Sequence, residues 1–139
     1  MVSGLSHMTF IVRDLERSAS FFEEIFGARE VYSSGDKSFS CAREKFLLIN
    51  ELWVCLMEGA PVAERSYNHV AFHIPDGELE DYIARLRSAG AEIKPPRARV
   101  EGEGHSVYFY DYDNHLFELH TGTLEERLKC YAQGERNED

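Results

Sequence analysis

The chain has 139 residues, of which 43% are hydrophobic and 29% charged, values typical of one compact soluble domain or of two small repeats that share a core. Its formal net charge of −10 at pH 7 argues against a nucleic-acid partner, because a polyanion needs a basic surface. No apolar run approaches the roughly 18 residues that cross a bilayer, and the N-terminus lacks a secretion signal, so we expect a cytoplasmic protein.

The first predicted strand, residues 4–12, is nearly repeated by a second one at residues 66–74. Each carries one histidine early in the run, His7 in the first copy and His69 in the second. The two copies lie about half a chain length apart. This pattern predicts a duplicated module in which each copy brings a possible metal ligand to a shared site.

A helix is predicted after each of these strands. Asp14 can cap the first helix, which Gly27 and Ala28 end and in which apolar residues form one buried stripe: Leu15, Ala19, Phe22 and Phe26. The second opens at Pro75-Asp76 and ends at Gly90-Ala91, with its own stripe: Leu79, Ile83 and Leu86. The distance in sequence between the two Gly-Ala pairs agrees to within one residue with the distance between His7 and His69.

Strand signals separated by turn residues follow each helix. In the first half they cover residues 29–33, 38–42, 46–50 and 52–57, and in the second half residues 91–94, 105–110 and 116–121. Each half therefore predicts β-α-β-β-β, and we expect an α+β protein with modules at residues 1–62 and 63–123. A last segment, residues 124–139, combines a helix over 124–133 with a polar tail that we expect to be frayed.

Strand residues two apart share a face, and this alternation decides which side chains meet. His7 and Thr9 share a face of the first strand, and His69 shares one with Tyr67 in the repeat. Near the end of the chain, polar side chains share faces in the same way: Ser106 with Tyr108, and Glu118 with His120. The opposite faces are more apolar and suit packing under the helices, so a curved sheet would gather the polar residues into a cup.

His7, His69 and Glu118 are the sharpest metal-ligand candidates. Two neutral imidazoles and a carboxylate form a facial set that leaves positions open on a divalent ion, and these ligand types permit Mn, Fe, Co, Ni or Zn. A single strand histidine is more often a hydrogen-bonded structural residue, but the matching places in a repeat favour ligands. The other histidines lack that symmetry and are interpreted as surface or structural: His73, His105, His115 and His120. The three cysteines are spaced too irregularly for a CxxC metal site.

Longer runs carry a family resemblance: residues 5–9, 67–72, 99–111 and 114–120, with residues 39–46 and 122–128. They resemble the vicinal oxygen chelate superfamily, which includes glyoxalase I and extradiol dioxygenases, and within it the hydrolytic branch of the fosfomycin resistance proteins. The resemblance covers nearly the whole chain. It implies a cup-shaped sheet built from two modules and a domain-swapped homodimer, in which His7 comes from one chain and His69 and Glu118 from its partner. The sequence leaves pairing of the modules within one chain open.

The resemblance also implies a Mn(II)-dependent epoxide hydrolase that adds water to the oxirane of fosfomycin, gives a diol and confers resistance. The attacking water must lose a proton to a positioned base, and the resemblance assigns this role to Glu44. It assigns phosphonate binding to Arg127 and hydrogen bonding to Thr9, Ser106 and Tyr108. The thiol-transferring relatives carry a lysine where this chain has Ala98, so Arg99 or Arg97 takes its place. They also carry a serine in a potassium-binding loop where Gly102 stands, so we expect no potassium dependence.

Three other functions compete with hydrolysis. A thiol transferase using glutathione or bacillithiol keeps the metal but needs no Glu44. The second alternative is a metal-free protein that sequesters an antibiotic. Such proteins lack the ligand triad, so its presence in this sequence counts against that function. Glyoxalase I uses a fourth protein ligand, whereas the first-half strand that mirrors Glu118 offers only Cys55, Leu56 and Met57. The sequence also leaves open whether fosfomycin or another phosphonate is the physiological substrate, and whether Trp53 and Tyr67 line the pocket or the core.

Overall fold

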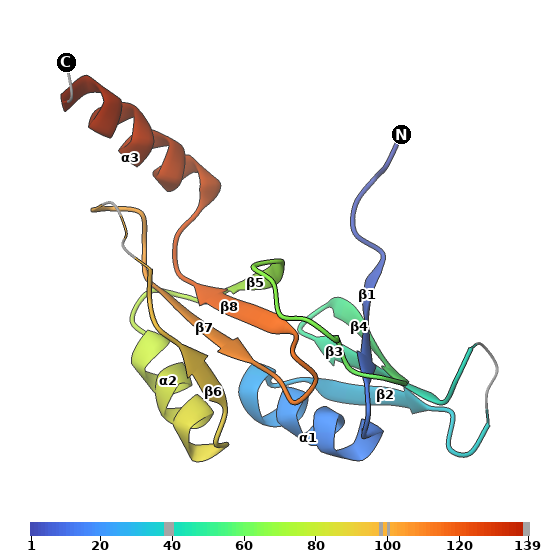
Figure 1. The fold of residues 1–139 in the computed structure, drawn as a ribbon. Helices are drawn as coiled ribbons and strands as arrows, with labels where there is room; N and C mark the ends of the chain where they lie inside the picture. The colour runs from blue at the N-terminus through green and yellow to red at the C-terminus, as the bar shows by residue number, and fades with distance from the viewer. Residues whose placement is uncertain (38–40, 98, 100, 138–139) are drawn as a thin grey trace. The chain divides into compact units, whose positions relative to one another are not determined.

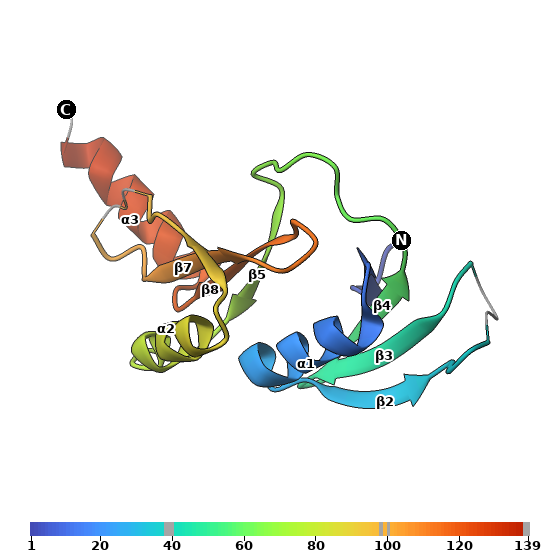
Figure 2. The same ribbon diagram turned by 60° about the horizontal axis from the view of Figure 1, so that its bottom comes forward.

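The computed structural model describes residues 1–37, 41–97, 99 and 101–137, which divide into two compact units. The first unit comprises residues 1–66 and 111–115, and the second comprises residues 67–110 and the chain from residue 116 onward. Each unit holds one four-stranded sheet with a helix on one of its faces (Figures 1 and 2). Each half of the chain supplies its own sheet, so the predicted duplication is confirmed.

The first sheet has the strand order β1-β4-β3-β2. Its elements are β1 (His7–Val12), α1 (Leu15–Phe26), β2 (Arg29–Ser33), β3 (Glu44–Ile49) and β4 (Leu52–Glu58). β1 runs parallel to β4, and the other pairs are antiparallel. The strand predicted at residues 38–42 is wrong in its described part, because Cys41 and Ala42 form a bend that leads into β3. Residues 38–40 lie outside the described residues.

The second sheet repeats this pattern with the order β5-β8-β7-β6. Its elements are β5 (His69–His73), α2 (Leu79–Ser88), β6 (Glu92–Lys94), β7 (Ser106–Tyr110) and β8 (Leu116–His120). α2 begins later than predicted, because Asp76 and Gly77 first form a turn in which Gly77 has a φ of 87°. α3 (Leu124–Asn137) continues beyond the predicted end at residue 133, because Gly134 keeps the helical backbone; residues 138 and 139 of the predicted tail lie outside the described residues.

The ends of α1 follow the local sequence signals. The side chain of Asp14 accepts a hydrogen bond from the backbone N–H of Arg17, which satisfies one of the free donors of the first turn. Gly27 ends the helix with a φ of 66°, a left-handed conformation that glycine adopts without strain. Helix α1 is therefore fixed at both ends by residues visible in the sequence.

The core of each unit lies between its helix and the apolar face of its sheet. In the first unit α1 contributes Phe22 and Ile25, which are fully buried against the sheet residues Val12, Leu47, Val54 and Leu56. In the second unit Leu86 of α2 is fully buried with a matching set: Val107, Phe109, Phe117 and Leu119. These positions alternate with the polar ones, as predicted, so each sheet keeps a polar face away from its helix. Within the described part of the chain, no helix is both long and apolar enough to span a membrane.

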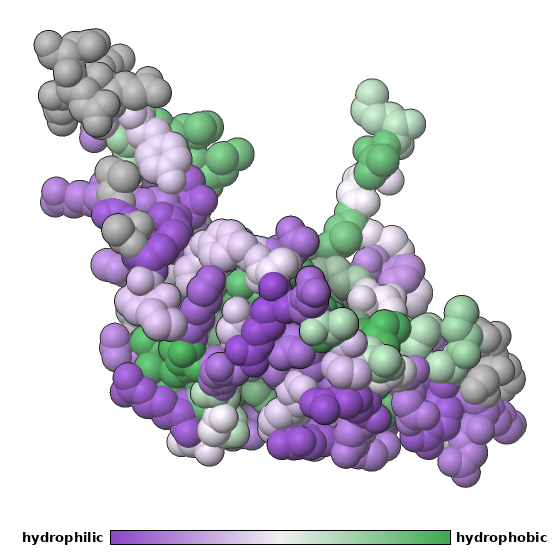
Figure 3. Space-filling model, in the orientation of Figure 1, coloured by the Kyte–Doolittle hydropathy of each residue, from purple (hydrophilic) through white to green (hydrophobic). Residues whose placement is uncertain are grey.

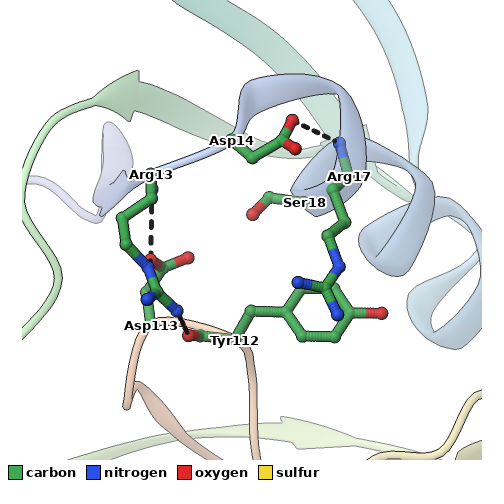
Figure 4. Close-up of a pocket in the computed structure, with 6 residues that line it drawn as sticks. All are labelled: Arg13, Asp14, Arg17, Ser18, Tyr112 and Asp113. Carbon is green, nitrogen blue, oxygen red and sulfur yellow. Dashed lines mark hydrogen bonds and ion pairs between the residues drawn. The ribbon is translucent and has the colours of Figure 1, made fainter.

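Residues 111–115, which connect β7 to β8, belong to the first unit. Asp113 is almost completely buried and accepts hydrogen bonds from the backbone N–H and the Nε of Arg13. A pocket of about 230 Å³ opens beside this contact (Figure 4), with six lining residues: Arg13, Asp14, Arg17, Ser18, Tyr112 and Asp113. Both arginines already have partners there, since the Arg17 guanidinium lies 3.7 Å from the centre of the Tyr112 ring. These contacts anchor the connection to α1.

Candidate metal centre

The polar face of the second sheet forms the wall of a pocket of about 280 Å³. β8 lies between β5 and β7, so Glu118 stands opposite Ala71 on one side and Tyr108 on the other. One step along the same face, His120 stands opposite Ser106. The pocket is lined by eight residues: His69, Ala71, Glu118, His120, Gly122, Thr123, Leu124 and Arg127.

The closest pair of candidate ligands is His69 and Glu118, whose Nε2 and Oε1 atoms lie 3.1 Å apart. The Nδ1 of His69 lies 2.7 Å from the backbone carbonyl of Tyr67. A carbonyl only accepts, so Nδ1 carries a hydrogen, and Nε2 is the ring nitrogen directed at the carboxylate. A ring nitrogen and a carboxylate oxygen at this separation can share a proton or serve as adjacent ligands of one divalent ion. The donor set therefore fits a divalent ion, and metal-binding histidines commonly donate their other N–H to a carbonyl in this way.

Glu118 is held through its other oxygen and is almost completely buried. Oε2 accepts hydrogen bonds from Ser106 Oγ at 2.6 Å and from Arg99 Nη2 at 3.2 Å. Burial alone would raise the pKa of Glu118, but the hydrogen bonds from Ser106 and Tyr108 and the charge of Arg99 outweigh it and lower the pKa. The side chain is thus an ionised carboxylate with Oε2 fixed and Oε1 directed toward His69.

His120 extends this network and was missed as a site residue by sequence reasoning. Its Nδ1 lies 2.6 Å from Ser106 Oγ, and its Nε2 lies 3.3 Å from Arg127 Nη2. Because Ser106 gives its only proton to Glu118, Nδ1 must donate to the hydroxyl, and Nε2 then accepts from Arg127. Burial is the largest influence on the pKa of His120, which is lowered, in keeping with a neutral ring. Its place two residues after Glu118 on one strand face was the available signal.

Two tyrosines complete the wall beside the ligand pair. The hydroxyl of Tyr67 donates to the hydroxyl of Tyr108 at 3.1 Å, and Arg99 Nη2 lies 3.2 Å from the same oxygen. Burial and the bond from Tyr67 raise the pKa of Tyr108 to about 12. Tyr108 therefore remains a phenol that hydrogen-bonds to Glu118. Tyr67 contacts the pocket residues His69 and Tyr108, which favours the pocket over the core among the two roles left open for it.

Glu103 is a second residue that the sequence did not reveal. Its side chain is 0% exposed, although it lies in the loop before β7. Its Oε1 accepts from Arg97 Nη2 at 2.6 Å and from the Tyr131 hydroxyl at 2.8 Å. No periodic pattern covers this loop, so nothing in the sequence distinguished Glu103 from an exposed charge.

In the first unit, His7, Thr9 and Glu44 occupy the polar face of the sheet. The register places Thr9 opposite Cys55 and Glu44 opposite Met57, so all of these side chains share one face. Ser6 Oγ lies 3.0 Å from Nδ1 of His7, whose ring packs against Trp53 with centroids 4.3 Å apart.

Glu44 is 8% exposed and is therefore not a solvated charge at a strand end. Its backbone N–H donates to Ser34 Oγ at 2.9 Å, and its Oε2 lies 3.6 Å from Cys55 Sγ. Burial and the neighbouring carboxylate raise the pKa of Cys55 to about 11, so the thiol stays protonated and donates to Glu44. This contact engages Oε2, one of the two carboxylate oxygens of Glu44.

The structure brings together all six predicted site residues of the second half of the chain. His69, Arg99, Ser106, Tyr108, Glu118 and Arg127 all belong to the second unit and are linked by the contacts above. His7, Thr9 and Glu44 belong to the first unit. No group of three or more potential ligands gathers among the residues that the structure describes.

The chain is similar to several characterised proteins. The profile of the Glyoxalase/Bleomycin resistance protein/Dioxygenase superfamily matches residues 4–119. Fosfomycin resistance protein FosX from Listeria innocua is 64% identical over 131 residues, which is 94% of this chain and 98% of the relative. Metallothiol transferase FosB from Shouchella clausii is 39% identical over 138 residues, 96% of this chain and 90% of that protein. A crystal structure of a mutant FosX from Listeria monocytogenes, complexed with Mn(II) and 1S,2S-dihydroxypropylphosphonic acid, has a TM-score of 0.87 at 56% identity and covers 94% of this chain and 99% of that one.

Proposed function

Because the chain belongs to the Glyoxalase/Bleomycin resistance protein/Dioxygenase superfamily and to its FosX family, we propose that it is a Mn(II)-dependent epoxide hydrolase that adds water to fosfomycin and confers resistance to it. The observation that carries the proposal is the pairing of His69 Nε2 with Glu118 Oε1, 3.1 Å apart in the wall of the pocket. The dihydroxy phosphonate in the related structure supports hydrolysis, because a diol is what water addition to an oxirane produces.

The proposed metal ligands are His7, His69 and Glu118. When bound, Mn(II) supplies Lewis-acid stabilisation of the charge that develops on the departing epoxide oxygen. The hydrogen bonds from Ser106 and Tyr108 keep Glu118 ionised and oriented for this role. The carbonyl of Tyr67 fixes the tautomer of His69.

The other polar residues bind the substrate and move a proton. Arg99 and Arg127 hold the phosphonate, with a hydrogen bond from Thr9. Ser106 and Tyr108 give their protons to Glu118 and accept from Arg99, so they act on the substrate by orienting those two side chains. Glu44 takes a proton from the attacking water. The oxygen of this water bonds to one carbon of the oxirane, and the bond between that carbon and the ring oxygen breaks. The resulting alkoxide takes up a proton from solvent water and Glu44 releases its proton to solvent, so both hydroxyl groups of the diol are protonated, Glu44 is again a carboxylate and the phosphonate keeps its charge.

Phosphorus NMR of fosfomycin tests the reaction directly. With Mn(II) and no thiol, we expect conversion to the diol, and glutathione or bacillithiol should add no second product. Glu44→Gln should abolish hydrolysis while retaining Mn(II) affinity, because Glu44 belongs to the base and not to the ligand set. Turnover that is insensitive to chelation of the metal would contradict the enzyme assignment.

A thiol transferase is the second candidate, because the FosB relative is 39% identical over most of the chain. That reaction replaces the water by a thiol and has no use for a buried carboxylate at Glu44. Product that forms only when thiol is present, with Glu44→Gln as active as the wild type, would favour the transferase over the hydrolase.

We also propose a domain-swapped homodimer in the cytoplasm. Apolar side chains are exposed along α3 (Figure 3), which supports an interface with a second copy: Leu124, Leu128 and Tyr131. The three cysteines are free thiols, as a reducing compartment requires. Refolding a mixture of His7→Ala and His69→Ala chains tests the swap. A swapped heterodimer keeps one intact ligand set and regains activity, whereas pairing within each chain leaves every site defective.

A further inference from the structure

Glu103 is a fully buried carboxylate surrounded by cations. Besides Arg97, its Oε1 lies 3.5 Å from Arg99 Nη1 and 3.7 Å from Arg127 Nε. The three arginines come from two separate segments, the loop before β7 and the helix α3. None of the roles assigned above uses Glu103, although its burial makes it one of the most enclosed charged groups in the chain.

Three guanidinium groups that converge on one atom repel one another, and the repulsion grows as water is excluded. A buried carboxylate between them offsets this repulsion. Arg97 donates a hydrogen bond to it, and the guanidinium groups of Arg99 and Arg127 form ion pairs with it at longer distances. Arg99 and Arg127 are 14% and 33% exposed, so the latter in particular has room to turn toward solvent if its acceptor is lost. Glu103 thus supplies the negative charge that allows the guanidinium groups of Arg99 and Arg127 to stay close together before a ligand binds.

The loop that carries Glu103 is packed against the segment that leads into α3 and against the middle of that helix. A Cβ atom on Gly102 would lie 2.8 Å from Cys130 Sγ, and one on Gly104 would lie 2.8 Å from the backbone nitrogen of Gly122. Tyr131 donates to Glu103 from the same helix. These contacts leave no room for side chains between loop and helix, so the Glu103 cluster fixes Arg127 of α3 relative to Arg99 of the loop.

We propose that Glu103 is a positioning residue for anion recognition. Glu103 holds the guanidinium groups of Arg99 and Arg127 as a preorganised pair that binds the phosphonate of the substrate. Tyr131 of α3 orients the carboxylate of Glu103 by its hydrogen bond. This inference rests on the proposed function, because it takes the anion to be the phosphonate of the epoxide. Preorganised charged side chains bind a ligand more tightly, because they lose little conformational entropy when the ligand binds.

Inorganic phosphate is the probe, with its dissociation constant measured by calorimetry on the Mn(II)-loaded protein. Glu103→Gln keeps the shape of the side chain but removes the charge that gathers the arginines. We expect phosphate binding to weaken roughly tenfold or more, and KM for fosfomycin to rise more than kcat falls. Mn(II) affinity should stay within about threefold of the wild type, because the ligands of the ion are unchanged.

Two further variants separate positioning from charge and from folding. Glu101→Gln makes the same change in net charge at an exposed residue of the same loop, and should leave phosphate binding unchanged. Tyr131→Phe removes only the hydroxyl that orients Glu103, and should weaken phosphate binding by about threefold even if Glu103→Gln does not fold.

The outcomes are decisive in both directions. Unchanged phosphate binding in Glu103→Gln and Tyr131→Phe would overturn the proposal. Tighter binding in Glu103→Gln would also overturn it, because Glu103 would then act only by opposing the anion. A wild-type protein that binds phosphate in this pattern but does not hydrolyse fosfomycin would contradict the proposed function and leave the role of Glu103 standing.

Discussion

The Ser106→Ala variant tests whether the ligand carboxylate is oriented by the hydroxyl beside it. Ser106 Oγ donates to Glu118 Oε2 at 2.6 Å and accepts from Arg99 Nη2 at 2.7 Å. It also lies 2.6 Å from Nδ1 of His120. The substitution therefore removes one hydrogen bond to a charged oxygen and leaves two buried donors without their shared acceptor.

The magnitude follows from the contacts that remain. A hydrogen bond to a charged group contributes about 1.5–3 kcal/mol, but Arg99 keeps its own bond to Glu118 Oε2, so we take the lower part of that range. About 1.4–2 kcal/mol corresponds to a roughly tenfold to thirtyfold loss of Mn(II) affinity, within the span typical of residues that orient metal ligands.

The assay is titration of the protein with Mn(II), with the free ion followed by its paramagnetic resonance signal. Thr121→Ala is the matched control, because it removes a hydroxyl that accepts from the backbone N–H of His105 at 3.0 Å instead of bonding to Glu118. It should bind Mn(II) as the wild type does. A folded Ser106→Ala protein with wild-type affinity would refute the reasoning and show that Arg99 alone orients the carboxylate.

Three further predictions concern other parts of the molecule. With a pKa of about 11, Cys55 is only about 0.1% thiolate at pH 8, so a thiol reagent should label the exposed Cys41 quickly and Cys55 far more slowly. In the folded protein the labelling rate of Cys55 should rise with pH up to about 11. Phe22→Ala removes a fully buried ring from the first unit and should lower the free energy of unfolding by about 3–5 kcal/mol in urea titrations, whereas a fall below about 1 kcal/mol would contradict the assigned core. Removal of divalent ions by a chelator should abolish fosfomycin turnover and added Mn(II) should restore it, while exchange of sodium for potassium should leave the rate unchanged.

The β-α-β-β-β repeat could be predicted because its signals are local. The alternation of polar and apolar residues in β1 and β5 assigned both faces correctly, since a strand has a period of two wherever it lies in the fold. Asp14 and Gly27 marked the ends of α1, because capping depends on a few adjacent backbone groups.

Glu103 and His120 could not be predicted because their roles depend on partners distant in the chain. Tyr131 and Arg127 of α3 contact Glu103 in its loop. This is a tertiary contact, and the hydrophobic periodicity of a sequence carries no information about it. His120 lacked a counterpart in the repeat, and symmetry was the argument used to select histidines.

The arrangement explains how an acidic protein can bind a dianion. At physiological ionic strength, charges more than about 8 Å away are largely screened, so the net charge of −10 matters less than the groups around the pocket. There, three guanidinium groups face two carboxylates, Glu103 and Glu118, which leaves one positive charge. A bound divalent ion adds two more. Phosphonate affinity should therefore depend on the metal, and inorganic phosphate should bind the metal-free protein more weakly than the Mn(II)-loaded protein; equal affinities would show that the arginines alone recognise the anion.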